Sequence, residues 1–499
     1  MPVRPSRAGH GEHRSKEWHH VPQPEPSNLV TTDICIIGAG AAGLSVAATT
    51  GLLGVPTVLI ERGRMGGDCL NSGCVPSKAL IAAARAAHDI RTAGRFGIKA
   101  QPPIIERKRL MAHVQEVIDS IAPTDSVARY RALGVEVIEA DARFVDARTV
   151  VAGERSVRAR RFVIATGAGP AIPPIPGLAD VPFLTNETVF ALDETPRRLV
   201  IIGGGPIGVE LAQAHRRLGS EVTIIEADTL LGREDPELAD VIRMALRRDG
   251  VRLLEGARVT RVQAVSSGVT LDLEGQGAPE MLNASHLLVA IGRRPRLDGL
   301  GLEAAGIAFD PRGITVDAGL KTSNRRVYAI GDCAGGPQFT HVASYQAGLV
   351  VRNALFRLPV KADYAAVPRV TYTDPELAAV GLSEAQARAE QTGVMVYRWP
   401  FAEVDRARAE RETAGLIKAV VSRKGVVLGA AIAGPKAGEL LAPWTLAVRT
   451  GMKIGAMADA IMPYPSLSEI SKRVAVQSYA AHLRNPWVGR MIRFLRRFG

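Results

Sequence analysis

A glycine motif that occurs twice constrains the fold of this 499-residue chain more than any other feature of its sequence. Each copy follows an apolar, β-branched stretch, opens a helical pattern, and precedes a second apolar stretch that ends in a glutamate. The defining residues are Gly38, Gly40, Gly43 and Glu61 in the first copy, and Gly203, Gly205, Gly208 and Glu226 in the second. This order is that of a dinucleotide-binding βαβ unit, in which glycines let the backbone approach a pyrophosphate and the acid binds a ribose hydroxyl. A single GxGxxG is a weak signal, but two complete units predict an α/β chain that binds two dinucleotides.

A pair of cysteines, Cys69 and Cys74, follows the first unit closely. Pro76 suits the first turn of a helix, and the Ala-rich run from Lys78 to Ala87 predicts that helix. Cys74 would then lie at a helix N-terminus, where the dipole favours a thiolate that Cys69 can trap as a disulfide. A zinc half-site and two buried structural thiols are the alternatives. A structural zinc site takes four ligands, and the sequence holds no second cysteine pair, so the redox pair is preferred.

Together these motifs resemble the pyridine nucleotide–disulfide oxidoreductases, a family that includes dihydrolipoamide dehydrogenase, glutathione reductase and mercuric reductase. Residues 66–78 match the family's GGxCxNxGCxPSK pattern, and the resemblance covers nearly all of residues 30–485. It implies FAD at the first βαβ unit, a nicotinamide cofactor at the second, and a redox-active disulfide beside the flavin. It also implies that Cys69 is the outer interchange thiol and Cys74 the inner, flavin-contacting thiol.

The resemblance implies roles for residues outside the glycine motifs as well. Lys78 is expected near the flavin N5 edge, paired with Glu210. The segment 165–167 returns the chain to FAD, and Asp332 is expected to bind the ribityl chain. The expected cofactor-binding residues are Gly38, Gly40, Gly43, Glu61, Gly67, Lys78, Thr166, Gly167, Gly203, Gly205, Gly208, Glu210, Glu226, Gly292, Gly331 and Asp332.

Glu226 bears on the choice of nicotinamide cofactor. A carboxylate at the end of this strand accepts hydrogen bonds from ribose hydroxyls and repels a 2′-phosphate. NADPH users in the family usually place arginine there. Arg233 follows in the sequence and would soften the preference. The sequence therefore predicts FAD and NADH as cofactors, with NADPH as the alternative.

The electron acceptor depends on the segment Tyr464–Glu469. Dihydrolipoamide dehydrogenase and glutathione reductase carry His-Pro-x-x-x-Glu there, donated across the dimer, and the histidine is the acid–base group for substrate thiols. This chain has tyrosine, as mercuric reductase does, yet no cysteine follows Cys333 to match that enzyme's C-terminal cysteine pair. The expected catalytic residues are Cys69, Cys74, Lys78, Tyr464 and Glu469.

The expected activity is electron transfer from NAD(P)H through FAD and the disulfide to a small-molecule acceptor. That acceptor is a metal ion, as in the mercuric type, a quinone or a small disulfide. Two alternatives stay open: a dihydrolipoamide dehydrogenase, and a membrane- or nucleic-acid-associated flavoprotein regulator. The intact cysteine pair argues against the regulator, because function is inferred from the residues of the site and not from the fold alone.

Length predicts several domains, because a chain of 499 residues is too long for one core. The expected fold class is α/β, with two Rossmann-like dinucleotide-binding domains and a C-terminal α+β domain that the family uses to form a homodimer. The predicted boundaries are a disordered tail at 1–29, an FAD-binding domain at 30–172, an NAD(P)-binding domain at 173–297, a second FAD-binding part at 298–363, a dimerisation domain at 364–485 and a basic tail at 486–499. Short strands are expected around Val135–Ile138 and Phe144–Val150, and residues 370–381 resemble the opening strand of the family's dimerisation domain.

Net charge and cysteine content indicate which partners and which cellular compartment to expect. A net charge of +12 can indicate nucleic acid, but no nucleic-acid motif is present, so a basic surface that attracts anionic NAD(P)H is preferred. Four cysteines in this length suit a reducing cytosol and predict a cytoplasmic protein, with Cys35 and Cys333 in the core. No metal site is expected, because the histidines of the N-terminal stretch are irregularly spaced and favour disorder.

The segment Trp487–Gly499 is amphipathic. At helical spacing its apolar residues share one face, and its arginines lie largely opposite: Trp487, Val488, Met491, Ile492 and Leu495 against Arg490, Arg493, Arg496 and Arg497. This pattern is typical of a helix that contacts a membrane surface. Alternatively, this helix packs on its own domain or on a partner subunit, and this packing is preferred to a membrane contact.

Overall fold

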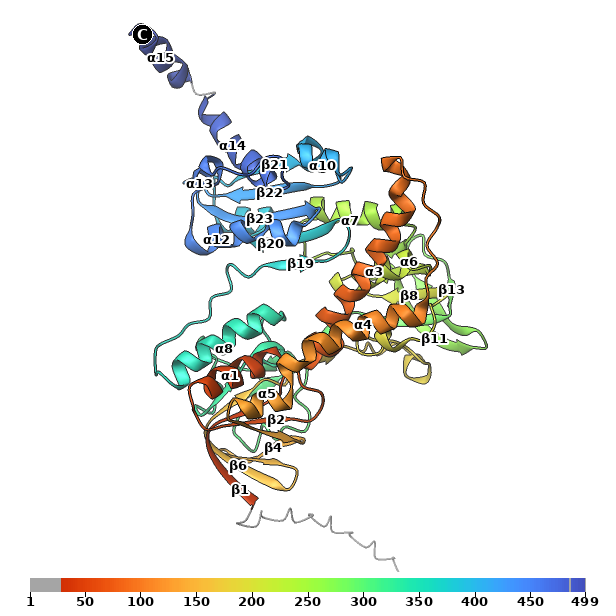
Figure 1. Ribbon diagram of the computed structural model, residues 1–499, viewed down its shortest axis with the longest axis vertical. Helices are drawn as coiled ribbons and strands as arrows, with labels where there is room; N and C mark the ends of the chain where they lie inside the picture. The colour runs from red at the N-terminus through yellow and green to blue at the C-terminus, as the bar shows by residue number, and fades with distance from the viewer. Residues whose placement is uncertain (1–27, 484–485, 499) are drawn as a thin grey trace, which may run out of the picture.

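The computed structural model describes residues 28–483 and 486–498, and three larger sheets with their helices organise them (Figure 1). Most of the predicted N-terminal tail therefore lies outside the described residues. Leu29 already pairs with Ser156 and belongs to the first strand. The polypeptide runs through the first sheet, crosses to the second, returns to the first, and ends in the third, from which a C-terminal helix projects.

The first sheet joins strands from distant parts of the chain in the order β3-β2-β1-β6-β5-β4, with β18 also paired to β6. The strands are β1 (Leu29–Ile37), β2 (Thr57–Glu61), β3 (Val135–Glu139), β4 (Ala142–Asp146), β5 (Thr149–Ala152), β6 (Arg155–Ile164) and β18 (Val327–Ala329). β1, β2, β3, β6 and β18 are parallel, and continuous β-branched runs suit parallel strands that are covered on both faces. Helices α1 (Ala41–Leu52) and α8 (Thr340–Ala354) pack against each other beside this sheet (Figure 1).

The segment Phe144–Val150, predicted as one strand, is instead a hairpin made by β4 and β5. Phe144 pairs with Val150, so the two ends of the predicted strand lie opposite each other. Asp146 Oδ1 accepts a hydrogen bond from Arg148 N at 2.6 Å, a local side-chain contact that favours a turn. The prediction was wrong because apolar residues continue on both sides of this short turn.

The second sheet has the parallel order β10-β9-β8-β14, with helices α6 (Pro206–Arg217) and α7 (Pro236–Arg248) following two of its strands. Its strands are β8 (Arg198–Ile202), β9 (Glu221–Glu226), β10 (Arg252–Glu255) and β14 (His286–Val289). An antiparallel sheet packs with it, made of β11 (Arg258–Val265), β12 (Gly268–Glu274) and β13 (Met281–Ala284). Strands β7 (Ala168–Pro170) and β15 (Arg293–Pro295) pair where the chain enters and leaves this region.

The two glycine motifs adopt the same packing. A Cβ on Gly43 would lie 1.9 Å from Gly38 O, and a Cβ on Gly208 would lie 2.0 Å from Gly203 O. Only glycine allows the helix to approach the preceding turn this closely, as a dinucleotide-binding unit requires. Both predicted βαβ units are therefore present, since β1, α1 and β2 repeat as β8, α6 and β9.

The third sheet is antiparallel, in the order β19-β20-β23-β22-β21. Its strands are β19 (Arg369–Thr371), β20 (Glu376–Gly381), β21 (Met395–Pro400), β22 (Leu416–Val421) and β23 (Val427–Gly434). Residues 370–381, read as one opening strand, are two strands joined by a turn that contains a cis peptide at Asp374-Pro375. Trp444 is fully buried behind this sheet, and its Nε1 donates to Ser471 Oγ at 3.0 Å.

Helices connect and cover the sheets. The segment between β2 and β3 forms α2 (Gly67–Asn71), α3 (Cys74–Thr92), α4 (Arg107–Ile121) and α5 (Val127–Ala132), and α3 packs on α6. The third sheet is covered by α12 (Ala442–Thr450) and α14 (Glu469–Leu483) among others. The remaining short elements are β16 (Phe309–Asp310), β17 (Gly313–Ile314), α9 (Glu384–Glu390), α10 (Asp405–Ala409), α11 (Ala437–Leu440), α13 (Ile454–Asp459) and α15 (Pro486–Leu495). Among the described residues, no helix combines the length and the apolar character needed to cross a bilayer.

Candidate active site

The two cysteines lie on consecutive helices beside the first glycine motif. Cys69 is in α2 and Cys74 is the first residue of α3, where the sequence predicted a helix N-terminus. Gly67 has φ 60°, and a Cβ added to it would lie 2.7 Å from Gly40 Cα. The cysteine turn therefore lies directly against the turn expected to bind a pyrophosphate. Both cysteines are free thiols, with Cys69 half-buried and Cys74 exposed.

The surroundings of the two sulfurs give them different acidities. The pKa of Cys74 is lowered to about 6, mainly by the hydrogen bond from Cys69 and also by Thr340 and the Lys78 cation, against the opposing effect of desolvation. The same hydrogen bond, together with burial, raises the pKa of Cys69. At neutral pH Cys74 is the thiolate and Cys69 the thiol, the assignment expected when the helix N-terminus also favours the anion.

Lys78 and Glu210 form the predicted ion pair, at 2.8 Å between Nζ and Oε2. Glu210 is in α6 of the second sheet's domain, and its side chain is only 7% exposed. Its Oε1 accepts a hydrogen bond from Tyr372 N at 2.8 Å, and Lys78 Nζ lies 4.3 Å from the centre of the Tyr372 ring. Residues from three parts of the chain therefore meet one helical turn beyond Cys74.

Two of these neighbours, Thr340 and Tyr372, were missed by the sequence analysis. Thr340 Oγ1 lies 3.7 Å from Cys74 Sγ, because the N-terminus of α8 points at the cysteines. Tyr372 reaches Lys78 from the turn between β19 and β20. Neither residue belongs to a motif, and both contacts join residues far apart in the sequence, so no local pattern could have indicated them.

The residues around the first glycine motif fit FAD. Glu61 Oε2 accepts from Ala39 N at 2.6 Å, and Oε1 accepts from Gly63 N at 2.8 Å, so the carboxylate holds the turn at the end of β2. Helix α1 starts after Gly40 without a side-chain cap, which leaves its first N–H groups free for an anion. A Cβ on Gly167 would meet no atom within 4 Å, so the predicted return segment beside Thr166 borders open space.

An arginine joins two acidic residues at the same site. Arg293 Nη1 lies 2.8 Å from Asp68 Oδ2, and its Nε lies 3.4 Å from Asp332 Oδ2. That Nε is buried without a hydrogen-bond partner. Burial raises the pKa of Asp332, against the effect of Arg293. A buried arginine nitrogen and a desolvated carboxylate suit a polar ligand such as the ribityl chain, and Gly331, with φ 72°, provides the turn before Asp332.

The second glycine motif repeats the arrangement of the first. Glu226 Oε2 accepts from Gly204 N at 2.7 Å, and Oε1 accepts from Asp228 N at 3.0 Å. Helix α6 starts after Gly205 without a side-chain cap, and Cβ atoms on Gly205 or Gly292 would meet nothing within 4 Å. The free helix N-terminus and the open space in front of it fit the pyrophosphate of a second dinucleotide.

Tyr464 and Glu469 have separate partners in this structure. Tyr464 is 69% exposed, and its hydroxyl donates to Asp405 Oδ2 at 2.9 Å. Glu469 Oε1 instead lies 2.6 Å from Arg473 Nη2, one turn along α14. The hydrogen bond to Asp405 raises the pKa of the Tyr464 phenol, since ionisation would place two negative charges together. Asp405 lies 59 residues from Tyr464 in the sequence, and no motif pointed to it.

Comparison with known proteins decides the family. The model of the pyridine nucleotide-disulphide oxidoreductase family matches residues 32–347, and the model of its dimerisation domain matches residues 367–475. The chain belongs to the pyridine nucleotide-disulphide oxidoreductase family. It is a flavoprotein disulfide reductase that takes electrons from NAD(P)H, and FAD and NAD(P)H are typical cofactors of this family. The dimerisation domain supports a homodimer.

Three relatives illustrate the range of the family around this chain. A mercuric reductase of Bacillus cereus is 38% identical over 440 residues, 88% of this chain and 70% of that protein. A dihydrolipoyl dehydrogenase of Geobacillus stearothermophilus is 36% identical over 454 residues, 89% of this chain and 96% of that protein. The solved Cu(II) complex of RclA, an HOCl-induced flavoprotein disulfide reductase of Escherichia coli, has a TM-score of 0.80 and 30% identity, covering 89% of this chain and 99% of RclA.

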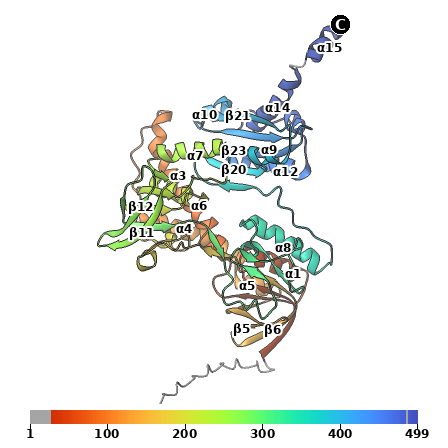
Figure 2. The same cartoon turned by 180° about the vertical axis from the view of Figure 1, so that it is seen from behind.

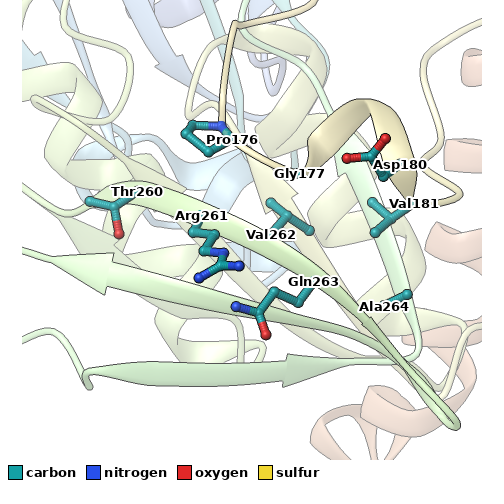
Figure 3. Close-up of a pocket in the computed structure, with 9 residues that line it drawn as sticks. All are labelled: Pro176, Gly177, Asp180, Val181, Thr260, Arg261, Val262, Gln263 and Ala264. Atoms are coloured by element: carbon teal, nitrogen blue, oxygen red, sulfur yellow. The ribbon is translucent and has the colours of Figure 1, made fainter.

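A surface cavity of about 620 Å³ lies apart from these residues (Figure 3). It is formed by the linker before the second sheet and by one side of β11, with Asp180 and Arg261 among its polar residues. None of the predicted site residues lines it. The cavity is therefore separate from the group of residues predicted to form the active site.

The acidity of Cys74 generates a spectroscopic prediction. In the FAD-loaded enzyme reduced by two electrons, we expect a thiolate-to-flavin charge-transfer band that is lost as the pH falls through about 6, because protonation removes the electron donor. Lys78→Met should move this midpoint to higher pH, since the Lys78 cation lowers the pKa of Cys74. Absorbance titration of the anaerobic enzyme measures both midpoints.

The two cysteine variants provide the matched control. Cys74→Ser should abolish the band, whereas Cys69→Ser should retain it, because only Cys74 is expected to contact the flavin. A band that survives in Cys74→Ser would mean that the roles of the two thiols are reversed.

Proposed function

We propose that this chain is an NADH-dependent reductase of a thiophilic metal ion, of the mercuric type, with small disulfides and quinones as poorer acceptors. The observation that carries the proposal is the contact of Tyr464 with Asp405 at the position where disulfide-specific relatives have histidine. An enzyme that oxidises dihydrolipoamide must remove a thiol proton near neutral pH. Histidine, with a pKa of about 6.5, suits that task, whereas a phenol with a pKa of about 10 does not.

The contact with Asp405 makes tyrosine an even weaker base, because it raises the pKa of the phenol above its ordinary value. A soft metal ion makes no such demand. It binds thiolates directly, and the low pKa of Cys74 supplies one without a base from the partner subunit. Tyr464 then serves as a hydrogen-bond donor and as a wall of the acceptor site, contributed across the dimer as in the relatives.

The reaction balances for a divalent ion. NADH and Hg(II) give NAD⁺, H⁺ and Hg(0), with two electrons transferred and no other reductant required. Bound FAD supplies the transfer of the electron pair between the nicotinamide and the cysteines. Cys69 and Cys74 hold the ion, and Lys78 offsets the negative charge of the Cys74 thiolate. The mercuric reductases among the relatives, and the Cu(II) complex of one structural neighbour, support a metal acceptor.

Acceptor choice is tested by turnover of the holoenzyme with each acceptor. We expect NADH oxidation with Hg(II) to exceed that with oxidised lipoamide, glutathione disulfide or a quinone by about tenfold or more in kcat/KM. We expect NAD⁺-coupled oxidation of dihydrolipoamide to be weak and to rise about tenfold in Tyr464→His, because histidine restores a general base. Tyr464→Phe is the control that removes the hydroxyl without adding a base. Wild-type oxidation of dihydrolipoamide at the rate of a true lipoamide dehydrogenase would refute the proposal.

The preference for NADH is proposed from Glu226. Its carboxylate is fixed by Gly204 N and Asp228 N at the end of β9, where it would face the ribose and repel a 2′-phosphate. We expect kcat/KM for NADH to exceed that for NADPH by about tenfold. Steady-state kinetics with both cofactors and one acceptor measures the ratio, and a clear advantage of NADPH would contradict this assignment.

We further propose that helix α15 contacts an anionic membrane surface. Both views show this helix projecting away from the rest of the molecule (Figures 1 and 2). Trp487 is 72% exposed and Phe498 74%, and the exposed apolar residues between them include Met491, Ile492, Phe494 and Leu495. Residues 486–498 carry four arginines and no acidic residue, so their charge complements anionic lipid.

Flotation with phosphatidylserine-containing vesicles tests this contact. We expect the full chain to float with the vesicles, and a chain truncated after Asn485 to remain in solution, because the apolar and basic residues of α15 are removed together. Vesicles of neutral phosphatidylcholine are the control and should bind less. Equal flotation of both chains would show that α15 is not the membrane contact. Loss of the dimer on truncation would instead assign α15 to the interface with the partner subunit.

A further inference from the structure

A buried lysine of the third domain, which consists of the third sheet and its helices, is surrounded by acidic residues from two domains. Lys418 is in β22, and its side chain is only 5% exposed. Its Nζ lies 2.7 Å from Asp235 Oδ2, 3.0 Å from Glu237 Oε2 and 3.0 Å from Glu384 Oε2. Asp235 and Glu237 belong to the NAD(P)-binding region, and Glu384 begins α9 of the third domain. The lysine therefore joins two domains.

The cluster is balanced by further cations. Arg398 pairs with Glu237 at 2.8 Å and with Glu384 at 2.7 Å, and Arg388 pairs with Glu384 at 2.9 Å. Burial alone would lower the pKa of Lys418, but its hydrogen bonds to Asp235, Glu384 and Glu237 raise it. A buried charge is tolerated only with such partners, so loss of the Lys418 cation leaves the facing carboxylates uncompensated.

A second cation from the third domain holds the preceding residue. Arg369 Nε, in β19, lies 2.9 Å from Glu234 Oε1 and 3.1 Å from Glu234 Oε2. The Glu234 side chain is only 10% exposed. Two consecutive acidic residues, Glu234 and Asp235, are therefore fixed by two strands of another domain.

These acidic residues end the loop that begins at Glu226. Within it, Glu234 N donates to Leu231 O at 2.9 Å, and Leu231 N donates to Gly204 O at 3.0 Å. Gly204 N in turn donates to Glu226 Oε2 at 2.7 Å. A continuous series of hydrogen bonds thus runs from the third domain, through the loop, to the second glycine motif.

Asp235 also starts helix α7. Its Oδ1 accepts from Glu237 N at 3.1 Å as an N-cap, while Oδ2 faces Lys418. The same carboxylate therefore fixes the end of the loop, the start of α7 and the contact with the third domain.

We propose that Lys418 and Arg369 are positioning residues for the nicotinamide cofactor, which hold the Glu226–Asp235 loop and its glycine motif in the binding geometry from outside the NAD(P)-binding domain. The inference rests on the binding of NAD(P)H at Gly203–Gly208. It means that the third domain, besides forming the dimer, sets the affinity of the second dinucleotide site. Neither residue contacts the cysteines, so the transfer of electrons to the acceptor should be unchanged once the cofactor is bound.

The test separates cofactor binding from turnover in the FAD-loaded dimer. We expect Lys418→Met to raise KM for NADH, and Kd for NAD⁺ by isothermal titration, about five- to tenfold, with kcat within about twofold of wild type. Lys418→Arg should restore most of the affinity, because it keeps the charge. Arg369→Met should weaken NAD⁺ binding in the same direction. Arg312→Met is the matched control, since Arg312 pairs with Asp310 at an exposed site outside this loop and should leave KM and Kd unchanged.

A second variant keeps the test decisive if Lys418→Met does not fold. Asp235→Asn retains a good N-cap for α7 but removes the charge that faces Lys418, and we expect it to raise Kd for NAD⁺ as well. A lowered Tm with KM and Kd within twofold of wild type in these variants would overturn the inference, because the cluster would then be structural alone. A wild-type enzyme that neither oxidises NADH nor binds NAD⁺ would instead overturn the proposed function and the inference together.

Discussion

The ion pair between Lys78 and Glu210 holds the site together. It joins the helix that begins with Cys74 to the helix that begins with the second glycine motif, and Glu210 also accepts from the backbone of Tyr372 in the third domain. The Glu210 carboxylate is only 7% exposed, so water cannot solvate its charge if the Lys78 cation is lost. This contact, between residues 132 positions apart in the sequence, therefore helps to fix the cysteines relative to the second glycine motif.

The sequence predicted best what local packing determines. Both βαβ units were predicted correctly because Gly43 and Gly208 are needed for close approach within their own motifs, and helix α3 because proline and alanine favour it directly after Cys74. The hairpin at β4 and β5 was mistaken for one strand, since a short turn interrupts neither the apolar composition nor its spacing. Thr340, Tyr372 and Asp405 were missed because each meets its partner across a long separation in the chain, where neither periodicity nor motif carries information.

The contacts of Tyr464 and Glu469 differ from those that the family motif implies. The family resemblance implies that the glutamate would orient a histidine at position 464. Here Glu469 pairs with Arg473 in its own helix, and Asp405 takes over as the partner of Tyr464. The acidic residue expected from the motif is thus present but engaged elsewhere. The presence of the motif's glutamate therefore does not guarantee that it makes the interaction expected of it.

The position of the Glu226 carboxylate has a consequence for engineering. One of its oxygens accepts a hydrogen bond from Gly204 N in the glycine turn, and the other accepts from Asp228 N, so the backbone fixes the side chain. Such preorganisation lowers the entropic cost of binding. It also means that exchanging Glu226 to favour a phosphorylated coenzyme would open the turn that both coenzymes need. A successful redesign would have to supply a new acceptor for Gly204 N together with the new cation, and a single substitution cannot do both.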